Sequence, residues 1–315
     1  MDLGSVVHMR GLSGSTLRQV INRLTNHHVS DRTITAASYE RFNTIKHTMR
    51  FQRVGGGEVD FEICEPKALL ALVLRENAIV REWFEEAWRT HPSSPSEPWH
   101  LLVGWDEFCP GNKAAVKSSR KTMTLSFSFV ELRGRLHHDA AWVTPLAIRA
   151  SVLAEVAGGW SAVLRGFLRL MLLDVEGLYQ AGYPIPIGGS AHLLFAQVHT
   201  LLSDGDGVRQ ALEWLGAGAL KMCFRHWNVF DKNSDLADRC PGSKYVESSS
   251  TDASSFRTWT NDDLQAAAGV VVAARRRHHD GHIPMARVEQ IQKAYGYKFT
   301  EHGIISDTEL SRIIE

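Results

Sequence analysis

The strongest constraint on the fold is a strict alternation of side chains between Lys121 and Leu132. Apolar and polar residues take turns there, with Met123, Leu125, Phe127 and Phe129 alternating with Thr122, Thr124, Ser126 and Ser128. A period of two is that of a β-strand, whose successive side chains point to opposite faces of a sheet. The pattern therefore predicts a strand with one buried face and one solvent-exposed face. Other parts of the chain must cover the buried face of its sheet.

The periodicity of the neighbouring segments predicts further strands and helices. We expect strands over residues 99–108, 121–132, 141–149 and 192–203, with helices over residues 151–173 and 208–215. Pro145 lies in the third strand, and because central strands avoid proline we place this strand at a sheet edge or with a bulge. Gly158 and Gly159 are expected to interrupt the first of these helices. The run at 192–203 is so apolar that a buried helix would have the same pattern.

The residues before position 99 have a helical period instead. Thr16 and Gln19 have the spacing of a capping box at the start of a short helix, and Pro66 is a favourable first residue for a longer one. A proline- and serine-rich segment at 91–98 then breaks both helix and strand. The sequence thus predicts three regions: a helical N-terminal region with a linker (1–98), a mixed α/β core (99–230), and a polar excursion with C-terminal helices (231–315).

Charge and cysteine content exclude several classes of protein. Lys+Arg and Asp+Glu both number 35, so the net charge is zero and nucleic acid would have to bind to local patches. The four cysteines are irregularly spaced, which argues for a reducing compartment over a disulfide framework. The amino terminus has an acid where a secretory signal has positive charge, and no apolar run reaches the ~20 residues that span a bilayer. We therefore expect an intracellular protein without disulfides and without a membrane role.

Three acids are the candidate catalytic residues and metal ligands. Asp106 lies in an otherwise apolar strand, where burying an unpaired carboxylate would be costly, so it should be exposed or near a cation. Asp204 and Asp206 follow roughly 100 residues later on a glycine-flanked turn after the fourth strand. Carboxylates are preferred ligands of Mg²⁺, and a pair of such ions serves phosphodiester transfer. The sequence therefore predicts a Mg²⁺ or Mn²⁺ site at these three residues.

Two other interpretations of the segment Asp204–Gly207 stay open. Asp-Gly pairs are common turn signals, so the four residues can form a plain turn without chemistry. Gly205 and Gly207 also lie between a strand and a helix, as in a phosphate-binding loop, but the fingerprint requires a third glycine where Gln210 stands.

A second metal is suggested by Cys223 and His226, whose two-residue gap is that of half a zinc site. Cys240 or the histidines of the 278–282 cluster would supply the remaining ligands. The alternative is a buried thiol beside a hydrogen-bonded histidine. Basic residues at 275–277, and Arg165 with Arg169, are able to contact phosphates, although such runs are commonly solvated helix faces.

The last residues predict a helix that the sequence does not complete. Ser306 and Glu309 have capping-box spacing, so a helix is expected from Asp307, and Glu315 follows barely two turns later at ~3.6 residues per turn. We therefore expect a chain that stops inside an element.

Three motifs together resemble a group of DNA transposases. They are WDEFCPGNK at Trp105–Lys113, LSDGDG at Leu202–Gly207 and KMCFRHWNV at Lys221–Val229. From about Phe51 onward the chain is similar to the Plavaka branch of the Kyakuja, Dileera and Zisupton transposases.

The resemblance implies a ribonuclease H-like fold, whose catalytic acids come from the first strand, the end of the fourth strand and a later helix. On this basis Asp106 is the first acid and Asp204 or Asp206 the second. Cys223 with His226 matches a cysteine-rich step that follows the second acid. The third acid has no convincing counterpart in the sequence. The resemblance thus implies a nuclear, DNA-binding relative of metal-dependent nucleases, in a shortened and inactive copy.

The competing hypothesis is a non-catalytic scaffold that binds DNA or protein through its front helices and basic helix faces. Geometry separates the two hypotheses. The nuclease hypothesis requires the strand at 99–108 to neighbour the strand at 192–203 and to pair antiparallel with the strand at 121–132. A helix at 193–202 would contradict the nuclease hypothesis.

Overall fold

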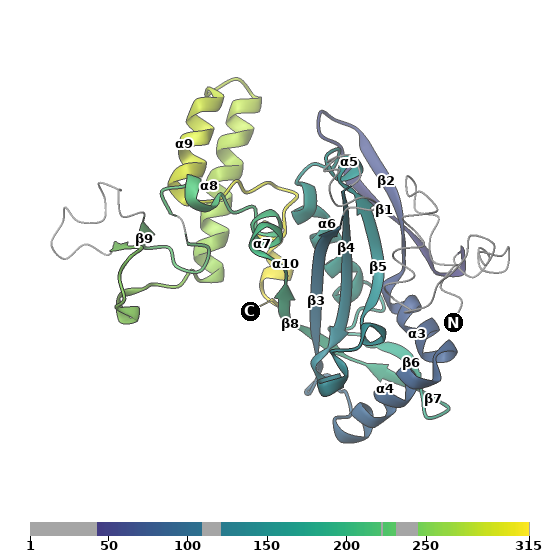
Figure 1. Ribbon diagram of the computed structural model, residues 1–315. Helices are drawn as coiled ribbons and strands as arrows, with labels where there is room; N and C mark the ends of the chain where they lie inside the picture. Colours follow the sequence, from purple (N-terminus) through teal and green to yellow (C-terminus); the bar gives the residue numbers. More distant parts are fainter. Residues whose placement is uncertain (1–42, 109–120, 222, 231–244, 315) are drawn as a thin grey trace. The chain divides into compact units, whose positions relative to one another are not determined.

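The computed structural model describes residues 43–108, 121–221, 223–230 and 245–314 (Figure 1). They form two compact units. The first comprises the described residues up to 157 together with 166–204, and the second comprises 158–165 with 205–313. The helix expected at 16–24 lies outside the described residues. Among the helices that are described, none is long and apolar enough to cross a membrane.

The first unit is built on a four-stranded mixed sheet. Its strands are β3 (Trp99–Phe108), β4 (Thr122–Phe129), β5 (Val143–Arg149) and β8 (Ala196–Leu202), in the order β5-β4-β3-β8 (Figure 1). β3 pairs antiparallel with β4 and parallel with β8, and β4 pairs antiparallel with β5. Both pairings predicted for the Asp106 strand are confirmed. The fold class is mixed α/β, with helices flanking a mixed sheet.

β5 lies at one end of the sheet, in agreement with the proline that it contains. Pro145 has no backbone N–H, so it cannot complete the hydrogen bonds of a central strand. The register between β4 and β5 also shifts between Leu125 and Phe127, which marks a bulge. The edge position and the bulge that were expected as alternatives therefore occur together.

The run at 192–203 is extended and not helical, but it is shared between two strands. β7 (Ser190–Leu194) pairs antiparallel with β6 (Tyr183–Ile187) in a separate hairpin, and β8 begins only after Phe195. The expectation of one continuous strand is wrong at this residue.

Ser93 provides the physical reason for the break. Its hydroxyl accepts from the Phe195 N–H and donates to the Phe195 carbonyl, both at 2.8 Å. The same carbonyl accepts from the Trp99 N–H at 2.8 Å. Because these contacts take up the backbone groups of Phe195, the ladder of β7 cannot continue through it. The 91–98 segment is thus a packed connection within the first unit.

The helical segments of the first unit are interrupted at an asparagine and at a pair of glycines. They are α3 (Pro66–Glu76), α4 (Ala78–Thr90), α5 (Ala150–Leu153) and α6 (Gly159–Leu172), the last of which begins in the second unit. The single long helix expected before the linker is divided at Asn77, whose backbone is extended and whose side chain accepts from the N–H groups of Ile79 and Val80. The interruption expected at Gly158 and Gly159 is present, and both residues have positive φ.

Helices cover the apolar face of the sheet. Phe127 and Phe129 of β4 are at most 1% exposed on that face. Phe84 of α4 contacts Trp99 and Phe129, with ring centroids 5.6 and 5.9 Å away. Phe167 of α6 contacts Phe127, with centroids 6.3 Å apart. Aromatic side chains dominate the energetics of such cores, so these contacts hold α4 and the second half of α6 to the sheet.

The opposite face of β4 is polar at its centre and buried at its ends. Thr124 and Ser126 are half-buried, but Thr122 and Ser128 are buried. The Ser128 hydroxyl donates to the Ala141 carbonyl at 2.7 Å. The expectation of a wet face is therefore correct only in the middle of the strand, because the chain after β4 bonds back to its end. Two short 3-10 helices form that returning segment: η4 (Val130–Arg135) and η5 (Asp139–Ala141).

A β-hairpin precedes these helices. β1 (Lys46–Gln52) pairs antiparallel with β2 (Glu58–Cys64) across a turn in which the glycines at 55–57 have positive φ. Cys64 ends β2 fully buried, and burial raises the pKa of its thiol to about 12. The described residues before position 98 thus contain two strands as well as two helices, and a helical N-terminal region is not confirmed.

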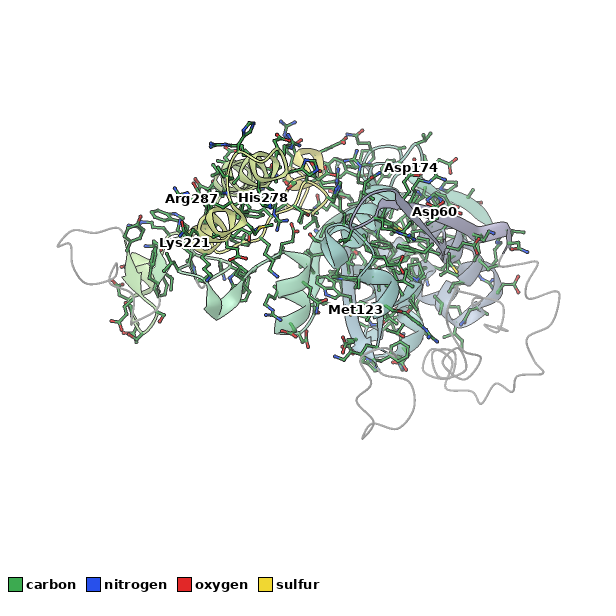
Figure 2. All side chains as sticks on the ribbon, turned by 90° about the horizontal axis from the view of Figure 1, so that it is seen from above. Asp60, Met123, Asp174, Lys221, His278 and Arg287 are labelled. Atoms are coloured by element: carbon green, nitrogen blue, oxygen red, sulfur yellow. The ribbon has the colours of Figure 1, made fainter. Side chains whose placement is uncertain are left out.

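The second unit is organised around the helical hairpin of α8 and α9, which carries His278 and Arg287 (Figure 2). Its apolar core consists of Ala267, Ala268, Val271, Tyr297 and Phe299. The elements of this unit are α7 (Gly205–Ala211), η6 (Gly216–Gly218), β9 (Val229–Phe230), β10 (Val246–Glu247), η7 (Ala253–Ser255), α8 (Asn261–His279), α9 (Met285–Tyr295) and α10 (Thr308–Ser311).

Two helices of this unit differ from expectation at their first turn. α7 begins at Gly205 instead of residue 208. α10 begins after Asp307, whose carboxylate accepts from the Leu310 N–H at 3.1 Å, so Asp307 is the N-cap and the predicted capping box at Ser306 is wrong. The Ser306 hydroxyl donates instead to the Thr300 carbonyl.

Glu213 is a buried carboxylate of the second unit. It is 8% exposed, and its Oε2 accepts from the Thr300 N–H at 3.0 Å. Burial raises the pKa of Glu213, an effect that the bond from Thr300 and the charges of Arg275 and Lys298 only partly offset. Its backbone has φ 55°, a left-handed conformation that is rare outside glycine.

We predict that Glu213→Gln removes a pH-dependent loss of stability. The folded chain holds the Glu213 proton more tightly than the unfolded chain, so wild-type stability falls as pH rises from the ordinary glutamate pKa through the raised folded pKa. Below that window the carboxyl is protonated in both states. Glutamine keeps an oxygen for the Thr300 N–H without a charge. Urea unfolding from about pH 4 to about pH 8 should show the variant gaining stability over the wild type.

The matched control is Glu289→Gln, on the exposed side of α9. This variant should follow the wild type at every pH. If the wild type instead gained stability over Glu213→Gln with rising pH, burial would not be the dominant influence on the Glu213 carboxyl.

Candidate functional site

The parallel pair of β3 and β8 brings two acids to one edge of the sheet. In this pair Gly104 lies opposite Leu202. Asp106 is the second residue after Gly104, and Asp204 is the second residue after Leu202. Asp106 lies inside β3, which continues to Phe108, and Asp204 lies between the end of β8 and the start of α7. Because the two strands are parallel, both acids lie toward the same end of the sheet. The carboxyl ends of β3 and β8 therefore define the candidate site.

Asp106 is exposed and holds one carboxylate oxygen in a local hydrogen bond. Its Oδ1 accepts from the Glu107 N–H at 2.8 Å, and its carbonyl accepts from the Thr124 hydroxyl at 3.2 Å. The apolar strand required that this carboxylate be exposed or near a cation, and exposure meets that requirement. The bond to Oδ1 leaves Oδ2 for a ligand.

Asp204 and Asp206 belong to different units. Asp204 is exposed and is the last residue of the first unit, whereas Asp206 lies in the second unit and in the first turn of α7. Asp206 pairs with Arg209, at 3.0 Å from the guanidinium nitrogen. Asp204 is thus the acid that belongs to the same unit as Asp106.

The predicted glycine turn at 204–207 is the start of a helix. A Cβ added at Gly205 would meet no atom within 4 Å, so no neighbouring atom requires a glycine there. A phosphate-binding loop, by contrast, uses glycines because the backbone must approach its ligand closely. The seven-residue α7 gives that interpretation no support.

Hydroxyl groups line the sheet beside Asp106, although they were not among the predicted site residues. Thr124 lies opposite Asp106 and Ser126 opposite Gly104 in the β3–β4 register. The Ser126 hydroxyl is 2.7 Å from that of Thr144 on β5. The signal was the polar half of the β4 alternation, read together with the antiparallel pairing. These hydroxyls make the surface of the sheet beside Asp106 polar.

Cys223 and His226 lie together, with Sγ 3.4 Å from Nδ1. Cys240 lies outside the described residues, and His278 uses its Nδ1 in a 2.9 Å contact with the Ile283 carbonyl. Across the described ranges, no three or more His, Cys, Asp or Glu residues are grouped so that they could hold a metal ion. The zinc site at Cys223 and His226 therefore stays a prediction.

No protein-family model matches the sequence of this chain, and no curated protein does.

We predict that Asp106 and Asp204 jointly bind Mn²⁺. Asp106→Asn and Asp204→Asn should each weaken Mn²⁺ binding at least about tenfold, equivalent to about 1.4 kcal/mol, because each removes one of two charged ligands. Electron paramagnetic resonance of free Mn²⁺ measures the binding directly. Asp206→Asn should leave Mn²⁺ binding unchanged in the same assay, because Asp206 already pairs with Arg209.

Glu107→Gln is the matched control for this titration. Glu107 is the next residue on β3, points to the other side of the strand and already pairs with Lys121 at 2.7 Å. Its loss should leave Mn²⁺ binding unchanged. Equal binding by Asp106→Asn and the wild type would exclude the site.

Proposed function

We propose that the first unit is a ribonuclease H-like domain derived from a DNA transposase, and that its substrate class is the phosphodiester backbone of DNA. The proposal rests on the likeness of the three motifs to the Plavaka group together with the strand pairings. In the order β5-β4-β3-β8 the first strand of the sheet has an antiparallel neighbour on one side and a parallel neighbour on the other. That is the arrangement expected for the first four strands of such a fold.

The single observation that carries the proposal is the parallel register of β3 with β8. It directs the chain after β8, with Asp204, toward the end of the sheet where Asp106 lies on β3, although the two acids are about 100 residues apart in the chain. A plain turn at residue 204 would not require an exposed acid at the end of the adjacent strand. The register therefore favours a shared ligand over two unrelated surface carboxylates.

Asp106 and Asp204 would hold Mg²⁺ or Mn²⁺, which would offset the negative charge of the scissile phosphate and of the two carboxylates. The role of the protein is then to fix the positions of the acids. The Glu107 N–H does this for Asp106 by holding Oδ1. On adjacent β4 the Thr124 hydroxyl already donates its proton to the Asp106 carbonyl. The Ser126 hydroxyl can donate to a bound phosphate when Thr144 donates to it.

The expected activity of this chain alone is low. Two carboxylates hold a single divalent ion loosely, whereas two-metal transfer usually needs a further ligand to align the attacking and leaving oxygens. Loss of that alignment removes several kcal/mol of barrier reduction. We therefore expect weak metal binding and no strand cleavage, with no rescue by added Mg²⁺ or Mn²⁺.

The test is to incubate the purified chain with labelled duplex and hairpin DNA in either metal, beside Asp106→Ala and the control Glu107→Gln. Absence of cleavage in all three is the expected result. Cleavage by the wild type and Glu107→Gln, but not by Asp106→Ala, would demonstrate a complete site and overturn the expectation of inactivity. Cleavage that Asp106→Ala retains would overturn the assignment of the site.

The second candidate function is a non-catalytic DNA-binding scaffold, favoured by the basic end of the α8–α9 hairpin. Arg277 and Arg287 are exposed there, and His279 is 91% exposed. Arg276 is less suited because it pairs with Glu301 at 2.9 Å. DNA retention without divalent metal, lost at high salt and in Arg277→Gln with Arg287→Gln, would support this candidate. Retention that requires Asp106 and metal would support the nuclease-type domain.

A further inference from the structure

Two histidines lie side by side on the same pair of strands. His100 is the second residue of β3, and His199 belongs to β8. Their ring centroids are 5.2 Å apart and their planes are perpendicular, at 89°. His100 is six residues before Asp106 on β3, so roughly 20 Å of strand, at ~3.3 Å per residue, separates this pair from the acids.

His199 lies at a β-bulge. Leu101 pairs with Val198 and Leu102 with Thr200, so His199 is an extra residue in the ladder of β8. Bulges are frequent beside functional sites.

Both rings use Nδ1 for contacts within the protein. The His100 Nδ1 lies 2.8 Å from Glu131 Oε1, and the His199 Nδ1 lies 2.7 Å from the Thr200 hydroxyl. Glu131 is an acceptor, so it holds the proton of His100 on Nδ1 and leaves a lone pair on Nε2. The side chain of His100 is 42% exposed and that of Glu131 is 9% exposed. His199 is exposed as well.

We propose that His100 and His199 bind one borderline divalent transition ion, such as Zn²⁺, through their Nε2 atoms, with water completing the coordination. Imidazole nitrogen suits Zn²⁺ and Cu²⁺, whereas carboxylate and water suit Mg²⁺ and Mn²⁺. A nearly buried carboxylate on the other nitrogen of a ligating histidine is the usual outer partner in zinc sites. Glu131 is therefore a positioning residue for His100.

A purely structural role accounts for only part of this arrangement. Glu131 accepts the His100 N–H with both oxygens at 3.1 Å, and so takes over the ladder where β4 has ended. That bond would form with any residue at position 100. It requires neither an imidazole there nor a second imidazole on the bulge of the adjacent strand.

The experiment is a calorimetric titration of the full chain with Zn²⁺, in a Cys223→Ser, Cys240→Ser background that removes the two cysteines of the other predicted zinc site. One ion should bind per chain. His100→Ala and His199→Ala should each reduce the affinity at least about tenfold, and Glu131→Gln by about tenfold, as is usual for the outer partner of a metal ligand. Glutamine keeps an oxygen for the His100 N–H, so its effect reports on the ring rather than on the strand end.

Nuclear magnetic resonance supplies the structural readout. In the background chain the ring Cε1–H signals of His100 and His199 should shift together on addition of Zn²⁺. Asp106→Asn should leave Zn²⁺ binding unchanged, so failure of this site and failure of the proposed nuclease site are distinguishable. Absence of Zn²⁺ binding, or equal affinity in the wild type and both alanine variants, would overturn the proposal.

Discussion

The first unit depends on the parallel pairing of β3 with β8. Parallel neighbours cannot be joined by a tight turn, so the chain between Phe108 and Ala196 must leave β3, cross the sheet and return. Closing so long a connection has an entropic cost, which the burial of Trp99, Leu101 and Val103 along β3 helps to offset. The same connection forms β4, β5 and the second half of α6. The segment that covers the apolar face is therefore also the one that brings β8 into place.

Local patterns predicted the strands whose neighbours agree with their sequence. The range 99–108 was correct to the residue, and Pro145 placed β5 at an edge because the effect of a missing N–H is local. The errors arose where a distant contact overrides the pattern. The contacts of Ser93 divide an apolar run at Phe195. The Ala141 carbonyl accepts a hydrogen bond from Ser128, which is buried. The alternation of Val59, Phe61 and Ile63 after three glycines is typical of the second strand of a hairpin. The charged residues between them make this apolar pattern difficult to recognise in the sequence.

The candidate site was predictable to the extent that it lies at strand ends. Asp106 and Asp204 follow from knowing where β3 and β8 stop, and their location toward one end of the sheet follows from the parallel pairing. Asp206 looked equivalent in sequence, yet it lies in the first turn of α7 with Arg209 as its partner. The His100 and His199 pair was not predictable, because a bulge depends on the register of two strands and Glu131 reaches them from a third segment.

The burial of Cys64 has a kinetic meaning for the first unit. Thiolate is the reactive form of cysteine, and burial raises the pKa of this thiol to about 12. Almost no thiolate is therefore present at neutral pH while β2 is folded. An alkylating reagent can then modify Cys64 only during transient openings that expose it. When reclosing is faster than alkylation, the rate of modification is proportional to the population of the open form. The rate at which Cys64 is alkylated therefore reports how often the first unit opens at the end of its β1–β2 hairpin.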